Sequence, residues 1–231
     1  MPVTPSTTEQ ETHRMSELTL AAVDHDGAIG ESRAALPEDT RGQFLRKAGV
    51  AGGGLAGGGL LMALNSGTAA AATSKGDIAI LNFALTLEYL ESAFYAEALR
   101  RGALTGRVLK FARVVADHEQ AHVDALKKAL GRKAVARPKF DFQGTTATRS
   151  KFIQTAVTLE DTGVKAYKGQ APRIKSDAIL EAALAIHSVE ARHAAWIRHI
   201  DSKRPAPAAF DAALSKRQVL AAVKGTGFIV G

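Results

Sequence analysis

Residues 81–95 read LNFALTLEYLESAFY, and this stretch holds Glu88 and, seven residues later, Tyr95. A Glu119-x-x-His122 pair begins 31 residues after Glu88. The same pattern occurs a second time, with the last interval shortened to 30 residues. The members of the second copy are Glu160, Tyr167, Glu190 and His193. The chain therefore carries one half of a site twice.

The Glu-x-x-His spacing predicts helices that face a common interior. Residues three apart on an α-helix lie about 60° apart around the axis and about 4.5 Å apart along it, so both side chains reach one pair of ions. A four-helix bundle that holds two metal ions uses one Glu from each of two helices and a Glu-x-x-His pair from each of the others. All six residues of that set are present, namely Glu88, Glu119, His122, Glu160, Glu190 and His193.

The donor atoms of this set indicate the metal. Carboxylates prefer hard ions such as iron or manganese, and one imidazole for each ion adds a nitrogen without making a thiolate-type site. Four carboxylates bring four negative charges into an apolar bundle, and two divalent cations offset them. The sequence therefore predicts two iron ions, with manganese as the alternative.

Four stretches resemble the core helices of bacterial ferritin-like domain proteins, a branch of the ferritin-like superfamily related to desiccation-associated ferritin-like proteins. They are LNFALTLEYLESAFY (81–95), DHEQAHVDAL (117–126), TLEDTGVKAY (158–167) and HSVEARHAAWIRH (187–199). The resemblance spans residues 75–225 and includes all six ligand positions. It implies a di-metal carboxylate site.

The resemblance also implies individual roles. By analogy with di-iron bundles, Glu119 and Glu190 are the favoured bridging ligands, although other pairs of these carboxylates could also bridge. Ferritins and bacterioferritins carry a Tyr seven residues after the first ligand Glu, where Tyr95 stands here. Tyr95 is therefore the candidate catalytic residue, by a hydrogen bond to a ligand or by electron donation, and simple packing is the alternative.

The pattern of apolar residues and helix breakers predicts an all-α fold: a ferritin-like four-helix bundle with a long crossover and a short C-terminal docking helix. The four long helices are expected over residues 75–101, 105–130, 149–170 and 176–202. The segment 132–148, between the second and third helices, is long enough to cross the bundle. A shorter helix over 210–223 is expected to dock through Phe210, Leu214, Val219 and Leu220.

Residues 1–72 are of a different kind from the predicted ferritin-like domain of residues 73–231. Residues 1–40 lack an apolar period and are rich in acidic side chains, which predicts disorder. Residues 41–72 resemble a twin-arginine export signal, although Gly42 stands where the second arginine belongs. A working signal would place the protein in the periplasm or cell envelope, with no transmembrane span in the mature form. A signal that is not processed would leave it in the cytoplasm.

The chain has a net charge of +7 and no cysteine, which excludes disulfides and thiolate clusters. Aromatic residues are not interleaved with the basic ones, so no specific nucleic-acid partner is predicted. The predicted partners are metal ions and oxygen or peroxide. A homo-oligomer is also considered, whereas a storage cage is disfavoured because the crossover and the tail after Pro205 would occupy bundle surface.

The ligand set is compatible with several functions. Oxidation of Fe(II) by oxygen or peroxide, as in a ferroxidase or peroxidase, is the first, and manganese-catalase-like chemistry fits the same ligands. A non-catalytic stress or desiccation-protective protein could use the metal only to stabilise its fold. Residues 118–122 also match the zinc metalloprotease motif H-E-x-x-H. The second copy has Val189 in place of His118, which argues against a protease.

Two further glutamates on the first helix need a separate interpretation. Glu91 could compete with Glu88 as the ligand, but the second copy has Gly163 at the position of Glu91 and keeps Glu160 at the position of Glu88. Glu88 is therefore the better candidate, and Glu91 is expected to face solvent. Glu97 is expected to face solvent as well.

Overall fold

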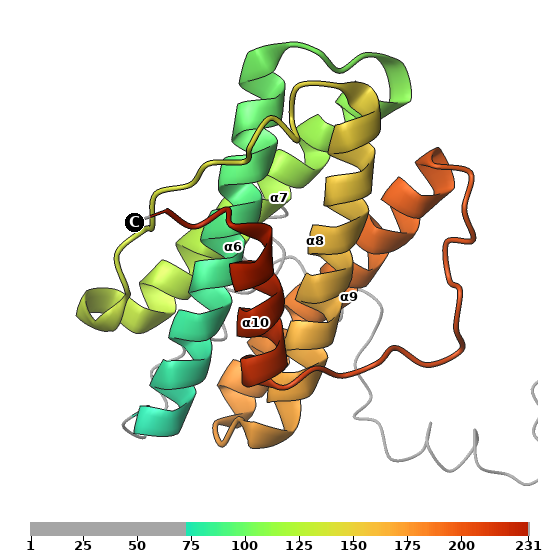
Figure 1. Ribbon diagram of the computed structural model, residues 1–231. Coiled ribbons are helices and arrows are strands. Elements are labelled where there is room, and N and C mark those ends of the chain that lie inside the picture. Colours follow the sequence, from blue (N-terminus) through green and yellow to red (C-terminus); the bar gives the residue numbers. More distant parts are fainter. Residues whose placement is uncertain (1–72, 231) are drawn as a thin grey trace, which may run out of the picture. The chain divides into compact units, whose positions relative to one another are not determined.

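The computed structural model describes residues 73–230, which form a helical bundle (Figure 1). The four long helices are α6 (Lys75–Arg101), α7 (Gly106–Leu130), α8 (Arg149–Gln170) and α9 (Asp177–Ile200). Single 3-10 turns at Gly131–Lys133 and Ala171–Arg173 follow α7 and α8, and a short helix, α10 (Lys216–Thr226), follows α9. The predicted all-α fold is confirmed, and each long helix begins and ends within two residues of its prediction.

The connection between α7 and α8 decides the topology. The α6–α7 and α8–α9 pairs are each joined by a short turn, whereas residues 134–148 run back along the length of the bundle (Figure 1). Phe142 of this crossover is buried, and its ring centroid lies 5.4 Å from that of Phe94 on α6. Phe140 forms an antiparallel bridge with Ile229. The predicted crossover is therefore present, and the side chain of Phe142 packs into the core.

The ends of α6 show why the chain turns where it does. The Ser74 hydroxyl accepts a hydrogen bond of 3.0 Å from the backbone N–H of Asp77, which caps the first turn. Gly102 follows the last turn with φ of 69°, a left-handed conformation that favours glycine. These caps set the length of α6 and so the height at which its middle residues meet the other helices.

Apolar side chains pack in two clusters that flank the middle of the bundle. On α7, one cluster includes Phe111 and Val115, and the other includes Val123 and Leu126. Ligand-type residues lie between these two pairs, at Glu119 and His122 of the same helix. The apolar clusters therefore keep water away from a short polar layer on both sides.

The last helix differs from the prediction of 210–223. It starts at Lys216, because Ser215 and Gln218 form a capping box there. Phe210 is 87% exposed and Leu220 is 42% exposed, so neither docks as expected. The buried contacts of α10 come instead from Val219 and Val223, with Leu214 partly buried in the preceding segment.

A close contact between this segment and α8 leads to a testable prediction. A Cβ at Gly169 would lie 1.9 Å from the backbone oxygen of Leu214, so any side chain there must displace the chain. We expect Gly169→Ala to lower the free energy of unfolding by about 1–3 kcal/mol, measured by urea denaturation. Gly225→Ala is the control, because no atom lies within 4 Å of its Cβ position. It should be neutral or slightly stabilising, and an equal loss in both variants would contradict the prediction.

No helix within residues 73–230 is long and apolar enough to span a bilayer. The predicted disorder of residues 1–40 and the predicted export signal of residues 41–72 lie outside the described residues. The predicted location therefore stays a prediction.

Candidate metal centre

Each of the four long helices directs ligand-type side chains toward the middle of the bundle. One Glu comes from α6 and one from α8, whereas α7 and α9 each contribute a Glu-x-x-His pair. The four Glu side chains are 0% exposed, and the two His side chains are also buried. The structure thus brings together all six predicted residues: Glu88, Glu119, His122, Glu160, Glu190 and His193.

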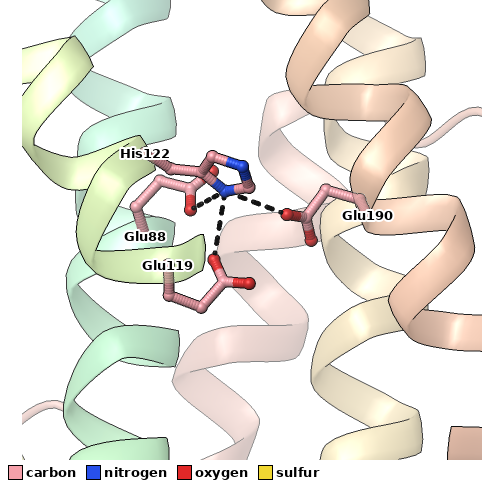
Figure 2. Close-up of side chains that lie close together, drawn as sticks. All are labelled: Glu88, Glu119, His122 and Glu190. Carbon is pink, nitrogen blue, oxygen red and sulfur yellow. Dashed lines mark hydrogen bonds and ion pairs between the residues drawn. The ribbon is translucent and has the colours of Figure 1, made fainter. Parts of the chain in front are cut away.

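The donor atoms fall into two groups of four, and within each group all donor atoms lie within 4.8 Å of one another. The first group consists of Glu88, Glu119, His122 and Glu190. Figure 2 shows its centre, where His122 Nδ1 lies 3.3 Å from an oxygen of each of the three carboxylates. A cation at this point would be in reach of one nitrogen and three carboxylates.

The second group mirrors the first around His193. Its Nδ1 lies 3.1 Å from Glu119 Oε1 and 3.3 Å from Glu160 Oε2, and Glu190 completes the group. Glu119 and Glu190 belong to both groups. They therefore lie where a carboxylate must lie to contact two ions at once.

Two tyrosines join the halves of the site crosswise. The Tyr95 hydroxyl of α6 donates a hydrogen bond to Glu160 Oε1 of α8. The Tyr167 hydroxyl of α8 donates one of 2.5 Å to Glu88 Oε1 of α6. Each Tyr therefore donates its hydrogen bond to the Glu of the other half of the sequence repeat, and not to the Glu seven residues before it on its own helix. Burial, followed by the charge of the Glu that accepts its proton, raises the pKa of each Tyr well above its ordinary value, so both hydroxyls remain donors at neutral pH.

Unpartnered polar atoms test whether a metal fits these residues. Buried polar atoms in proteins nearly always have a hydrogen-bond partner. Here Glu119 Oε1, Glu160 Oε2, both oxygens of Glu190 and His193 Nδ1 are buried without one. His193 Nδ1 lies within 3.3 Å of the first two oxygens, but these ion pairs do not have the geometry of hydrogen bonds. All of these atoms belong to residues of the two groups. Two cations would satisfy them, so the residues fit a di-metal site.

The electrostatics of the site reflect the crowding of its carboxylates. Burial raises the pKa of Glu88 to about 7, and burial together with Glu119 raises the pKa of Glu190 well above its ordinary value. Burial raises the pKa of Glu160 as well. Glu119 is the exception, because its contacts with the histidines outweigh burial and lower its pKa. The carboxylates with raised pKa values hold protons that a metal must displace.

The histidines hold protons as well. Burial alone would lower the pKa of His193, but the adjacent Glu119 and Glu160 carboxylates outweigh it and raise the pKa to about 10. The pKa of His122 is likewise raised well above its ordinary value, against the effect of burial, by Glu88 and the other carboxylates around it. Each ring must lose a proton from Nδ1 before that nitrogen can bind an ion.

His118 lies at the outer edge of the site and belongs to neither group of donor atoms. Its Nδ1 is 2.9 Å from His193 Nε2, on the opposite side of the His193 ring from the carboxylates. In the zinc metalloprotease interpretation, His118 and His122 would bind one ion together. The structure does not place them so, and the motif at residues 118–122 reflects a Glu-x-x-His pair with a histidine beside it.

Glu91 is one of two glutamates that the sequence interpretation placed wrongly. It is 3% exposed rather than solvent-facing, and its Oε2 has no hydrogen-bond partner. Its position three residues after Glu88 puts it on the same face of α6, by the geometry that governs the Glu-x-x-His pairs. The three-residue spacing from Glu88 is the sequence feature that indicates an inward-facing Glu91. Glu97 is also partly buried, where it accepts a hydrogen bond of 2.5 Å from the Thr146 hydroxyl of the crossover.

Comparison with known proteins agrees with this geometry. Residues 76–203, more than half of the chain, match the family described as Ferritin-like domain. No curated protein shows significant similarity to the chain. The relation to desiccation-associated proteins therefore stays a prediction. Because the matched region runs from the second residue of α6 to beyond α9 and contains all six residues of the candidate site, the chain belongs to the ferritin-like domain family.

Proposed function

We propose that residues 73–230 bind two iron ions and that this centre oxidises Fe(II) with oxygen. The observation that carries the proposal is the overlap of two groups of donor atoms, which share Glu119 and Glu190. Separate sites would need separate ligands, whereas shared carboxylates hold two ions side by side. Carboxylate and imidazole donors suit iron, and manganese is the alternative.

The chain assigns a distinct set of side chains to each ion. Glu88 and His122 would hold one ion, and Glu160 and His193 would hold the other, with the two shared carboxylates between them. The Tyr hydroxyls occupy one oxygen of Glu88 and one of Glu160, which leaves the other oxygen of each for metal. The contact of His193 Nε2 with His118 leaves Nδ1 as its ligand atom. Such outer contacts orient ligands in metal sites generally.

Two adjacent iron ions supply one electron each, which suits a two-electron oxidant such as oxygen or peroxide. The chain's own contribution is to hold the carboxylates apart from bulk water and to keep both Tyr protons in place. Tyr95 and Tyr167 lie within hydrogen-bond contact of ligands from opposite helices. They are therefore the groups best placed to orient these ligands, and we infer that Tyr95 also donates an electron to the site.

An apolar cavity favours oxygen over peroxide as the oxidant. The cavity lies between all four long helices, has a volume of about 30 Å³ and is lined by side chains such as Leu126 and Ile186. Tyr167 connects the cavity with the site, because it lines the cavity and its hydroxyl donates a hydrogen bond to Glu88. Peroxide would lose its hydrogen bonds with water on entering such a lining, whereas oxygen has none to lose.

The test is a metal titration followed by exposure to oxidant. Metal-free full-length protein is titrated with Fe(II) or Mn(II) without oxygen, and bound ions are counted. We expect about two ions per chain. Oxygen added to the iron-loaded protein should be consumed at about one molecule per two Fe(II), faster than Fe(II) reacts in buffer and faster than with an equal amount of peroxide.

Three other outcomes would each correct the proposal. A folded protein that binds less than one ion per chain has no di-metal site. Two bound ions without faster oxidation would indicate a metal that only stabilises the fold, as in a protective protein. A preference for Mn(II) together with rapid breakdown of peroxide would indicate manganese-catalase-like chemistry.

A further inference from the structure

We propose that Glu91 is a seventh protein ligand of the metal centre, which binds beside Glu190 and stabilises the trivalent state of an ion there. This inference rests on the proposed function. Glu91 lies one turn after Glu88 on α6, is 3% exposed, and has a buried carboxylate oxygen, Oε2, without a hydrogen-bond partner. A buried carboxylate with a free oxygen next to metal ligands has the chemistry of a ligand.

Gly163 provides the space for this carboxylate. A Cβ at Gly163 would lie 2.8 Å from Glu190 Oε2 and 3.4 Å from Glu91 Oε1. Both carboxylates therefore lie against the bare backbone of α8, with Glu91 beside Glu190 but outside the two groups of donor atoms. Gly163 lies inside the helix and does not have the positive φ that favours glycine, and glycine in a helix interior costs about 0.5–1 kcal/mol relative to alanine. Room for the carboxylates is the physical reason for a glycine at this position.

The same two positions break the symmetry of the repeat. Glu91 follows Glu88 by three residues, and Gly163 follows Glu160 by three. One half of the site therefore brings an additional carboxylate, and the other half brings the space that accommodates it. The two halves share the six ligands evenly, but the additional carboxylate of Glu91 has no counterpart in the second half, where Gly163 stands.

Charge counting indicates what the seventh ligand does. Four carboxylates offset two divalent ions, so a fifth carboxylate leaves an excess of one negative charge. That excess is offset when one ion goes from the divalent to the trivalent state. An additional anionic ligand in a buried site therefore favours the oxidised ion over the reduced one.

The test compares Glu91→Gln, which removes the charge and keeps the shape, with Glu91→Asp, which keeps the charge. Glu97→Gln is the matched control, because Glu97 lies on the same helix but contacts Thr146 and Arg101 rather than the site. Full-length variants are loaded with Fe(II) without oxygen. Bound ions are counted, and the midpoint potential of the Fe(III)/Fe(II) couple is measured.

We expect about two ions per chain in all variants, as in the wild type. Glu91→Gln should lower the preference for Fe(III) over Fe(II) by about tenfold or more, which raises the potential by about 59 mV or more for a one-electron couple. Glu91→Asp should lie closer to the wild type, and Glu97→Gln should match it. An unchanged potential in Glu91→Gln overturns the proposal for Glu91, whereas a wild type that binds less than one ion overturns the metal centre itself.

A second measurement needs no variant. In a crystal structure of the oxidised, iron-loaded wild-type protein, an oxygen of Glu91 should lie within bonding distance of an iron ion. A Glu91 carboxyl that is bonded to no ion in that structure overturns the proposal, even if the variants do not fold.

Discussion

Glu190→Ala should release both metal ions, whereas Glu88→Ala should release only one. Glu190 belongs to both groups of donor atoms, and Glu88 belongs to one. Removing a shared carboxylate takes a ligand and a balancing charge from two ions at once, and the loss of one ligand commonly weakens binding severely. Metal content after gel filtration should fall from about two ions per chain to less than one for Glu190→Ala, and to about one for Glu88→Ala.

Two control variants make this comparison decisive. Glu181→Ala changes an exposed carboxylate on the same helix as Glu190 and should keep both ions. His118→Ala should also keep both ions at saturating metal, because His118 lies outside both groups. Its affinity should fall by about 10–100-fold, since His118 contacts Nε2 of the ligand His193. If His118→Ala empties the site while Glu190→Ala leaves it full, the assignment of the ligands is wrong.

Metal-free protein should lose stability as the pH rises from about 5 to about 8. The pKa of Glu88 is raised to about 7 in the folded state, so the folded protein holds a proton that the unfolded chain releases above about 4.5. The stability that this proton provides is fully present below pH 4.5 and is lost as the pH rises through 7. For Glu88 alone, the loss in the free energy of unfolding is about 3 kcal/mol. The raised pKa of Glu160 acts in the same direction, and so does the raised pKa of Glu190.

The histidines extend this loss of stability to higher pH. The pKa of His193 is raised to about 10, so its proton stabilises the folded state below 6.5 and this contribution is lost as the pH rises through 10. Glu119 has a lowered pKa and acts in the opposite sense, but only as the pH falls below about 4.5. His118 and His187 also have pKa values lowered by burial and oppose the loss as the pH rises toward 6.5. The groups with raised pKa values are more numerous, so we expect them to decide the sign between pH 5 and pH 8.

Bound metal should remove this dependence. Mn(II) at a concentration a thousand times its dissociation constant stabilises the fold by about 4 kcal/mol for each site, and it replaces the protons. We expect Tm to fall by about 10 °C between pH 5 and pH 8 in the presence of a chelator, and to change little with Mn(II). Glu88→Gln is the control, because it removes one titrating group and should flatten the curve of the metal-free protein. A Tm of the metal-free protein that rises with pH over this range would contradict the electrostatic account.

The repeat in the sequence determined which six residues meet and which helices carry them. Seven-residue and three-residue spacings place side chains on one face of a helix whatever surrounds it, because the helix repeats every 3.6 residues. Gly102 and Gly131 likewise end α6 and α7 where the sequence predicts, since both adopt positive φ angles that other residues avoid. These features depend only on neighbours along the chain.

Contacts between helices were decided by the tertiary structure alone. Spacing along α6 turns Tyr95 inward, but only the packing of α8 against α6 shows that its partner is Glu160. The repeat favours Glu88 over Glu91 as the ligand because the counterpart of Glu91 is Gly163, yet that glycine lies opposite Glu91 and makes room for it. The helical repeat determines on which face of its own helix a side chain lies. Which atoms it meets depends on the space that the facing helix leaves, and for Glu91 that space exists because Gly163 has no side chain.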